Sequence, residues 1–208
     1  MGGKIQRMLA VAGLVLALAC SLAQAQGARE IKLVVKPLDF KVEANIPTPS
    51  SGSSSLDLPP RPGKIKYWLR LSVDFESLLE WLDEVKVSGY MVVRDPKDKQ
   101  LALLRGGHSL INVAKGQRHH SVLYLHPQAA VRFNYDWLYA AIVLKAGDNE
   151  YIVQQTRPGV AKLDPTLRWW EKTETLKVVS RDRLLARWET PFAFLNYDDY
   201  EQPLMPAP

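Results

Sequence analysis

Three histidines close together have side chains that could bind a metal ion: His119, His120 and His126. Neighbouring residues on a strand point to opposite faces, which separates His119 from His120. His120 and His126 share a face, but at about 3.3 Å per residue they lie roughly 20 Å apart. Zinc ligands must converge at about 2.0–2.1 Å from one ion. We therefore expect no metal site, and we interpret these histidines as polar residues of an exposed strand.

Other kinds of catalysis lack their sequence motifs. The chain has no nucleotide-binding glycine loop, no Gly-x-Ser-x-Gly elbow and no His-Glu-x-x-His motif. Its one cysteine, Cys20, lies in the N-terminal leader, so a chain cut after it has neither a nucleophilic thiol nor a disulfide. We expect a protein that is not an enzyme and that needs no cofactor.

Three of the six tryptophans are candidates for binding rather than packing. Trp68 lies on the polar face of an alternating segment, between two cations, so the alternation directs it toward water. Trp169 and Trp170 are adjacent, and neighbours on an extended chain cannot both face one core. We therefore expect Trp68 and one of this pair to contact a partner protein or a sugar. The other tryptophans are interpreted as core residues.

The first 25 residues read as a secretory signal peptide. Lys4 and Arg7 provide the positive start, residues 8–19 are uncharged and apolar, and Ala23–Ala25 is a small-x-small cleavage site ending at Ala25. The apolar stretch is too short for a stable membrane span, so we expect none in the mature chain. The protein is thus expected to be secreted, periplasmic or associated with the outer membrane. Alternatively, a weak lipoprotein box would anchor it through Cys20.

Composition excludes several classes of protein. Of 208 residues, 47% are hydrophobic and 24% are charged, which is ordinary for a globular domain. The net charge is +5, but two of the cations belong to the leader. The remaining Lys and Arg residues are interspersed with Asp and Glu, whereas nucleic-acid binding needs a concentrated basic face. We expect no nucleic-acid partner.

Beyond residue 63 the hydrophobic pattern has a period of two. Apolar residues alternate with polar ones from Ile65 to Phe75 and again from Val85 to Val93, and residues 138–145 are apolar on both faces. Gly106–Gly107 and Gly116 are interpreted as separators between further short strands. The pattern predicts an all-β fold: an immunoglobulin-like antiparallel β-sandwich, with an oligomer-binding-type small barrel as the alternative.

A segment rich in proline and serine divides the mature chain. Before it, Ile31, Leu33 and Val35 lie in one short extended run, separated by Pro37 from a second. The linker spans about 24 Å, so this strand can pair with its own sheet or add to a partner's sheet; self-pairing is favoured. The expected parts are 1–25 signal peptide, 26–44 strand segment, 45–63 linker, 64–201 sandwich and 202–208 tail.

Two segments carry a resemblance to a known family. They are the strand Gly116-Gln117-Arg118-His119-His120 and the segment Thr190-Pro191-Phe192-Ala193. With the linker and the Tyr67–Leu71 strand, they resemble the small secreted pilus-like proteins of verrucomicrobia, whose genes accompany a type IV pilus secretin apparatus. The resemblance runs over most of residues 30–202. It implies an immunoglobulin-like fold, a location outside the cytoplasm, no catalysis, and protein partners in a pilus or secretin assembly or in host-facing contact. Gly116, His119, Thr190, Pro191, Phe192 and Ala193 are landmarks of the family. A secreted carbohydrate-binding module, with a glycan as partner, is the alternative function.

Overall fold

The structure is a computed structural model, and it describes residues 34–49, 66–162, 164, 166–171, 177–178, 183–193 and 195. Several predicted features lie outside these residues: the signal peptide with Cys20 and Ala25, Ile31 and Leu33, most of the 45–63 linker, and the 202–208 tail. Within the described residues, no helix is both long and apolar enough to cross a membrane.

Strands dominate the described residues. In chain order they are β1 (Val35–Pro47), β2 (Tyr67–Ser77), β3 (Trp81–Arg94), β4 (Leu101–Ala114), β5 (Arg118–Leu125), β6 (Trp137–Ala146), β7 (Asn149–Thr156), β8 (Lys177–Val178) and β9 (Leu184–Ala186). A short helix, α2 (Pro127–Arg132), joins β5 to β6, and two 3-10 turns, η1 (Trp169–Glu171) and η2 (Arg187–Glu189), follow β7.

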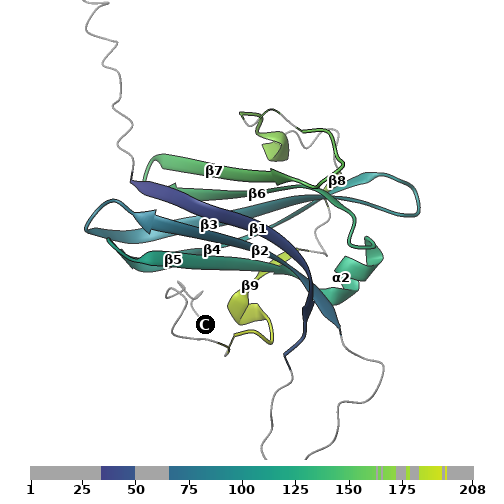
Figure 1. Cartoon of the computed structure of the whole chain (residues 1–208), viewed down its shortest axis with the longest axis horizontal. Helices are drawn as coiled ribbons and strands as arrows, with labels where there is room; N and C mark the ends of the chain where they lie inside the picture. The colour runs from purple at the N-terminus through teal and green to yellow at the C-terminus, as the bar shows by residue number, and fades with distance from the viewer. Residues whose placement is uncertain are drawn as a thin grey trace, which may run out of the picture. The chain divides into compact units, whose positions relative to one another are not determined.

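The strands form two sheets that pack as layers (Figure 1). The four-stranded sheet has the order β1-β2-β5-β9, and the five-stranded sheet has the order β7-β6-β3-β4-β8. One sheet contains the first, second and fifth strands, and the other contains the third, sixth and seventh. This is the arrangement of strands in an immunoglobulin domain. β4 lies beside β3, where variable-type domains carry an extra strand, and β9 lies beside β5. The prediction of an immunoglobulin-like sandwich is confirmed. The alternative, a small barrel, is wrong, because the strands form two separate sheets.

The inner faces of both sheets form one hydrophobic core. The alternation predicted for β2 is confirmed, because Leu69, Leu71, Val73 and Phe75 are all buried there. The inward side chains of β3 and β6 meet them: Val85, Val87, Met91, Val93, Ala140, Ile142 and Leu144. β6 also buries its opposite face in a second cluster, which confirms residues 138–145 as a central strand.

The expectation that Gly106–Gly107 separates two strands is wrong, because β4 runs through both glycines without interruption. The glycines are needed for close contact rather than for a turn. A Cβ on Gly106 would lie 2.0 Å from the carbonyl oxygen of Leu184, and one on Gly107 would lie 2.4 Å from that of Val87. The missing side chain of Gly106 lets β9 approach β4 across the sandwich, and that of Gly107 leaves room for the backbone of β3.

The N-terminal strand belongs to the sandwich. We expected a break at Pro37, but β1 continues through it, with only a register irregularity between Pro37 and Asp39. Proline cannot donate a ladder hydrogen bond, and an edge strand such as β1 tolerates that loss. β1 pairs antiparallel with β2, and the backbone N–H of Thr48 donates to the carbonyl of Lys66 at 2.9 Å. The two strands that flank the proline- and serine-rich segment are therefore neighbours in one sheet.

Candidate functional site

Trp68 is not exposed as we expected. The alternation places it correctly on the outer face of the four-stranded sheet, but only 4% of its surface is accessible. Phe192, from the segment after η2, lies 5.6 Å from it in an edge contact and stacks on Tyr124 at 4.5 Å. The indole N–H donates to Thr48 Oγ1 at 2.9 Å. Trp68 is therefore a packing residue beneath the C-terminal segment.

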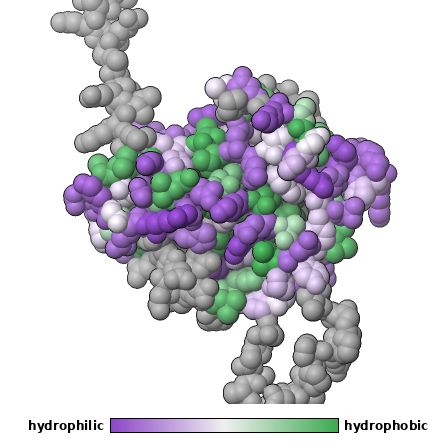
Figure 2. Space-filling view, viewed as in Figure 1, coloured by the Kyte–Doolittle hydropathy of each residue, from purple (hydrophilic) through white to green (hydrophobic). Residues whose placement is uncertain are grey.

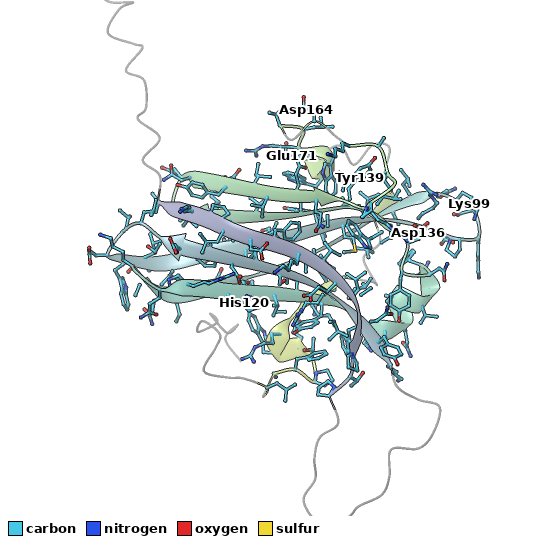
Figure 3. All side chains as sticks on the ribbon, in the orientation of Figure 1. Lys99, His120, Asp136, Tyr139, Asp164 and Glu171 are labelled. Atoms are coloured by element: carbon cyan, nitrogen blue, oxygen red, sulfur yellow. The ribbon has the colours of Figure 1, made fainter. Side chains whose placement is uncertain are left out.

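The expectation for Trp169 and Trp170 is also wrong, because both are buried, at 6% exposure each. They lie on η1, where successive residues diverge as on a helix instead of alternating as on a strand. Trp170 stacks on Tyr90 at 5.4 Å, and the indole N–H of Trp169 donates to Gln154 Oε1 at 3.0 Å. Figure 3 shows Tyr139, which also contacts Trp169, next to this turn. Both rings cover the outer face of the five-stranded sheet.

The His119 landmark and its neighbouring histidines have structural roles. We expected exposed histidines, but His119 is 1% exposed, packs on Phe75, and donates from Nε2 to the carbonyl of Ala114 at 2.6 Å. His126 accepts the backbone N–H of Gln128 at 3.2 Å, at the start of α2. The described residues contain no group of three side chains that could hold a metal ion.

The other landmarks fix turns. Gly116 follows β4 with φ of +79°, a conformation that favours glycine. The hydroxyl of Thr190 donates to the carbonyl of Arg187 at 2.6 Å and accepts the N–H of Phe192 at 3.2 Å. This double contact folds the segment so that Phe192 enters the sheet face, while Pro191 stays exposed and Ala193 is partly buried. Thr190 and Phe192 thus explain why Trp68 is covered.

Of the predicted strand-addition residues, the structure describes Val35. It is fully buried and pairs with Ser77 of β2. Next to it, the backbone N–H of Val34 donates to the hydroxyl of Tyr151 on β7 at 2.7 Å, which joins the edges of the two sheets. At Val35 the strand pairs with its own sheet, as favoured by the sequence.

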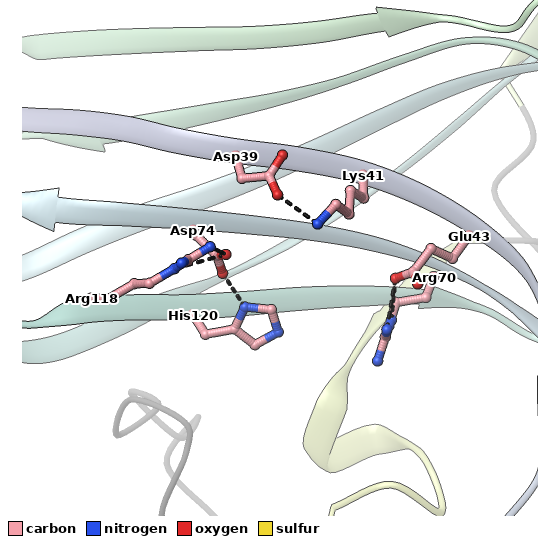
Figure 4. Close-up of polar contacts among 7 residues, drawn as sticks. All are labelled: Asp39, Lys41, Glu43, Arg70, Asp74, Arg118 and His120. Atoms are coloured by element: carbon pink, nitrogen blue, oxygen red, sulfur yellow. Dashed lines mark hydrogen bonds and ion pairs between the residues drawn. The ribbon is translucent and has the colours of Figure 1, made fainter.

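A charged strip remains open on the outer face of the four-stranded sheet. Figure 4 shows it running across three strands: Asp39, Lys41 and Glu43 of β1, Arg70 and Asp74 of β2, and Arg118 and His120 of β5. With Ser72, six of them line a shallow hollow of about 140 Å³. No residue of this strip was singled out from the sequence as a contact. The pattern that could have revealed it is the series of charged residues at the outward positions of neighbouring strands.

Most charges in the charged strip are paired with one another. Arg70 donates two hydrogen bonds to Glu43, at 2.6 and 3.0 Å, and Lys41 contacts Asp39 at 2.6 Å. Asp74 accepts hydrogen bonds from Arg118 and from Nδ1 of His120. Burial raises the pKa of Asp74, but the bonds from His120 and Arg118 outweigh burial and hold that pKa below its ordinary value. Burial lowers the pKa of Arg70, and its bond to Glu43 more than restores it. Arg70 and Asp74 are therefore charged, and their hydrogen bonds hold them in position.

Ser72, His120 and Asp74 are also the residue types of a hydrolytic triad. Asp74 orients His120 as such a triad requires. In the part of the chain that the structure describes, no hydrogen bond between Ser72 and His120 is seen, so the nucleophile–base link of a triad is not formed there. Asp74 is shared with Arg118, which is consistent with an ion-pair network.

Trp81 is the aromatic residue that sequence reasoning missed. It was assigned to the core, but 53% of its surface is exposed at the start of β3. It lines a hollow of about 400 Å³ together with Leu82, Asp83, Glu84, Lys86, Lys145 and Gly147. That assignment rested on the large buried area of aromatic residues in sheets, and it could not foresee the bend at residues 78–80 that precedes β3. The face in view in Figure 2 mixes hydrophilic and apolar side chains and has no continuous apolar patch.

Comparison with known proteins gives the family. A family model matches residues 25–205, which is most of the chain. The chain belongs to that family. The match includes the whole stretch, 30–202, over which the resemblance was noted, together with all six landmarks.

Solved structures agree on the fold. A crystal structure from Akkermansia muciniphila is 19% identical, with a TM-score of 0.68, and the match covers 84% of this chain and 94% of that one. At that identity the likeness shows the fold alone. An X-ray structure of a Northeast Structural Genomics Consortium target is 11% identical over 64% of this chain and 95% of that one; its TM-score of 0.25 carries no argument. No curated protein matches.

Proposed function

We propose that this protein is an exported binding module without catalytic activity, which acts through protein–protein contacts in a pilus-like assembly at the cell surface. Three features support the proposal: the N-terminal leader, membership of the family, and an immunoglobulin-like sandwich. The family model begins at residue 25, where the predicted cleavage falls. Host-facing contacts fit the same surface location.

The charged strip is the observation that carries this function. It presents both signs of charge on three hydrogen-bonded strands, so the positions of the charges are set by the sheet. Complementary charge patterns of this kind give a protein interface its register and exclude wrong partners. The aromatic residues on which the glycan alternative rested are buried, which favours a protein partner over a sugar at these positions.

A charge swap tests the strip. Glu43→Arg with Arg70→Glu rebuilds the ion pair in reverse, so the fold is kept while the pattern seen by a partner is inverted. We expect affinity capture from the producing cells to lose the pilus or secretin components that the wild-type protein retains. The matched control reverses the exposed pair Glu80–Lys115, outside the strip, and should retain them. Equal capture by both swapped proteins would contradict the proposal.

The absence of catalysis needs a separate test. A fluorophosphonate probe labels serines that a histidine activates, and Ser72 is the serine beside such a histidine. We expect no labelling of the native protein at any pH between 5 and 9. Labelling that disappears in Ser72→Ala would show that the charged strip is an active site.

A further inference from the structure

We propose that the hollow around Trp81 binds an acidic sugar, such as a uronic acid within an oligosaccharide. The hollow lies on β3 and the β6–β7 turn, away from the charged strip on β1, β2 and β5. It would therefore add a ligand to the proposed protein contacts without depending on them.

The exposed ring supplies the first part of such a site. Trp81 is the most exposed tryptophan among the described residues. Trp68, Trp137, Trp169 and Trp170 are all less than a tenth exposed, and Trp188 is only partly exposed. An aromatic face left in water gains by covering apolar surface, and the C–H face of a pyranose ring is flat and apolar enough to cover it. A hollow of about 400 Å³ beside the ring leaves room for a sugar.

Two lysines supply the second part. Lys86 and Lys145 are direct partners across β3 and β6, and like charges placed opposite one another on a sheet repel. Among the described residues, the ion pair of Lys145 is a long contact of 3.9 Å with Glu150, whose other oxygen accepts from Arg168 at 3.0 Å. Lys86 forms no ion pair with any residue that the structure describes. A bound carboxylate would relieve this repulsion.

Two carboxylates set the class of ligand. Asp83 and Glu84 line the same hollow, and Glu84 is held by the hydroxyl of Ser109, which donates to it at 2.5 Å. They balance the lysines, so the hollow has no excess positive charge to attract a polyphosphate or a nucleic acid. A ligand with one negative charge and many hydroxyls satisfies both sets: its carboxylate meets the lysines, and its hydroxyls donate to Asp83 and Glu84.

The test is calorimetric titration of the full chain with oligosaccharides that carry a single glucuronate, galacturonate or mannuronate residue, and with sialyllactose. Each has its own uncharged partner: the methyl esters and lactose. We expect at least one acidic sugar to bind about tenfold more tightly than its partner, because its carboxylate accepts a charge-assisted hydrogen bond from a lysine and the uncharged form does not. If no acidic sugar binds, or if the uncharged forms bind equally, the proposal is wrong.

Three variants assign binding to the hollow. Trp81→Ala and Lys86→Ala should each weaken binding about tenfold, whereas Trp81→Phe, which keeps an aromatic face, should retain most of the affinity. Tyr67→Ala removes another exposed aromatic ring, 40% exposed, and should change nothing. Unchanged binding in both Trp81→Ala and Lys86→Ala would overturn the assignment.

Discussion

The two outer faces of the sandwich are each partly covered by aromatic residues from the last third of the chain. On the four-stranded sheet the cover is Phe192, and on the five-stranded sheet it is the Trp169–Trp170 turn. The uncovered parts differ. The charged strip pairs most of its charges internally, whereas the Trp81 hollow leaves an exposed ring and two opposed lysines. A surface with paired charges suits recognition of a complementary surface, and one with unpaired groups suits a small ligand.

The largest expected effect is the loss of the cover on the five-stranded sheet. Trp170→Ala removes a buried ring that stacks on Tyr90, and we expect the free energy of unfolding to fall by about 3–5 kcal/mol. Urea unfolding followed by circular dichroism measures it. A fall below about 1 kcal/mol would mean that this cover contributes little to stability.

Removing the cover of the four-stranded sheet should lower the free energy of unfolding somewhat less. Phe192→Ala deletes one buried ring from a short segment, and we expect a loss of about 3 kcal/mol. Trp68 should become accessible in the same variant, because Phe192 packs against it. Acrylamide quenching measures that accessibility. Quenching equal to that of the wild-type protein would show that another segment shields Trp68.

Between the two faces, His108 makes stability depend on pH. Its Nε2 shares a hydrogen bond of 2.8 Å with Ser121 across the sandwich, and its Nδ1 is buried without a partner among the described residues. Burial lowers the pKa of His108 to about 4, and nearby Glu189 only partly opposes this. Because the unfolded histidine titrates near 6.5, the unfolded state binds more protons between these values, and stability falls as the pH drops through that window.

We expect His108 to account for about 2 kcal/mol of this loss between pH 6.5 and 4, allowing for partial exposure of the ring. Unfolding free energies measured across the window should decline in the wild-type protein and stay nearly level in His108→Gln. Asp74 acts below this range, since its pKa is lowered and its contribution is lost only as the pH falls below about 4. A decline of the same size in His108→Gln would assign the loss to other groups.

The smallest effect should come from the charged strip. The Glu43→Arg and Arg70→Glu swap exchanges the members of a partly exposed ion pair, and such pairs contribute about 0.2–1 kcal/mol. Thermal unfolding should therefore be almost unchanged. A large loss of stability would mean that the strip is a structural element, and it would separate the strip from the proposed partner contact.

Local patterns predicted the sheets well, because the alternation of apolar and polar residues shows which side of each strand faces the core. The alternate apolar residues from Leu69 to Phe75 and from Val85 to Val93 point inward as predicted. The same pattern cannot tell what covers the outer side. Trp68 is buried by Phe192, more than a hundred residues further along the chain, and that contact leaves no trace in the sequence around Trp68.

The candidate sites were harder to predict than the fold. Trp169 and Trp170 looked divergent only because an extended chain was assumed, and a single 3-10 turn buries both. Trp81 looked internal because aromatic residues in sheets are usually buried, although it lies at the start of β3, directly after a bend in the chain. His119 faces inward with Ser121 and Leu123 of β5. The alternation separated His119 from His120, but it was not used to decide which of the two faces the core.

The measurement that tests the account most directly is crosslinking mass spectrometry on the producing cells, with a reagent that reacts with lysines. The account predicts crosslinks from Lys41, within the charged strip, to envelope proteins of a pilus or secretin assembly. Lys97 and Lys99, in the turn between β3 and β4, are reference lysines that should yield few. If the protein is found only as a free monomer, or if its crosslinks avoid the face that carries Lys41, a role in partner binding through the charged strip is contradicted.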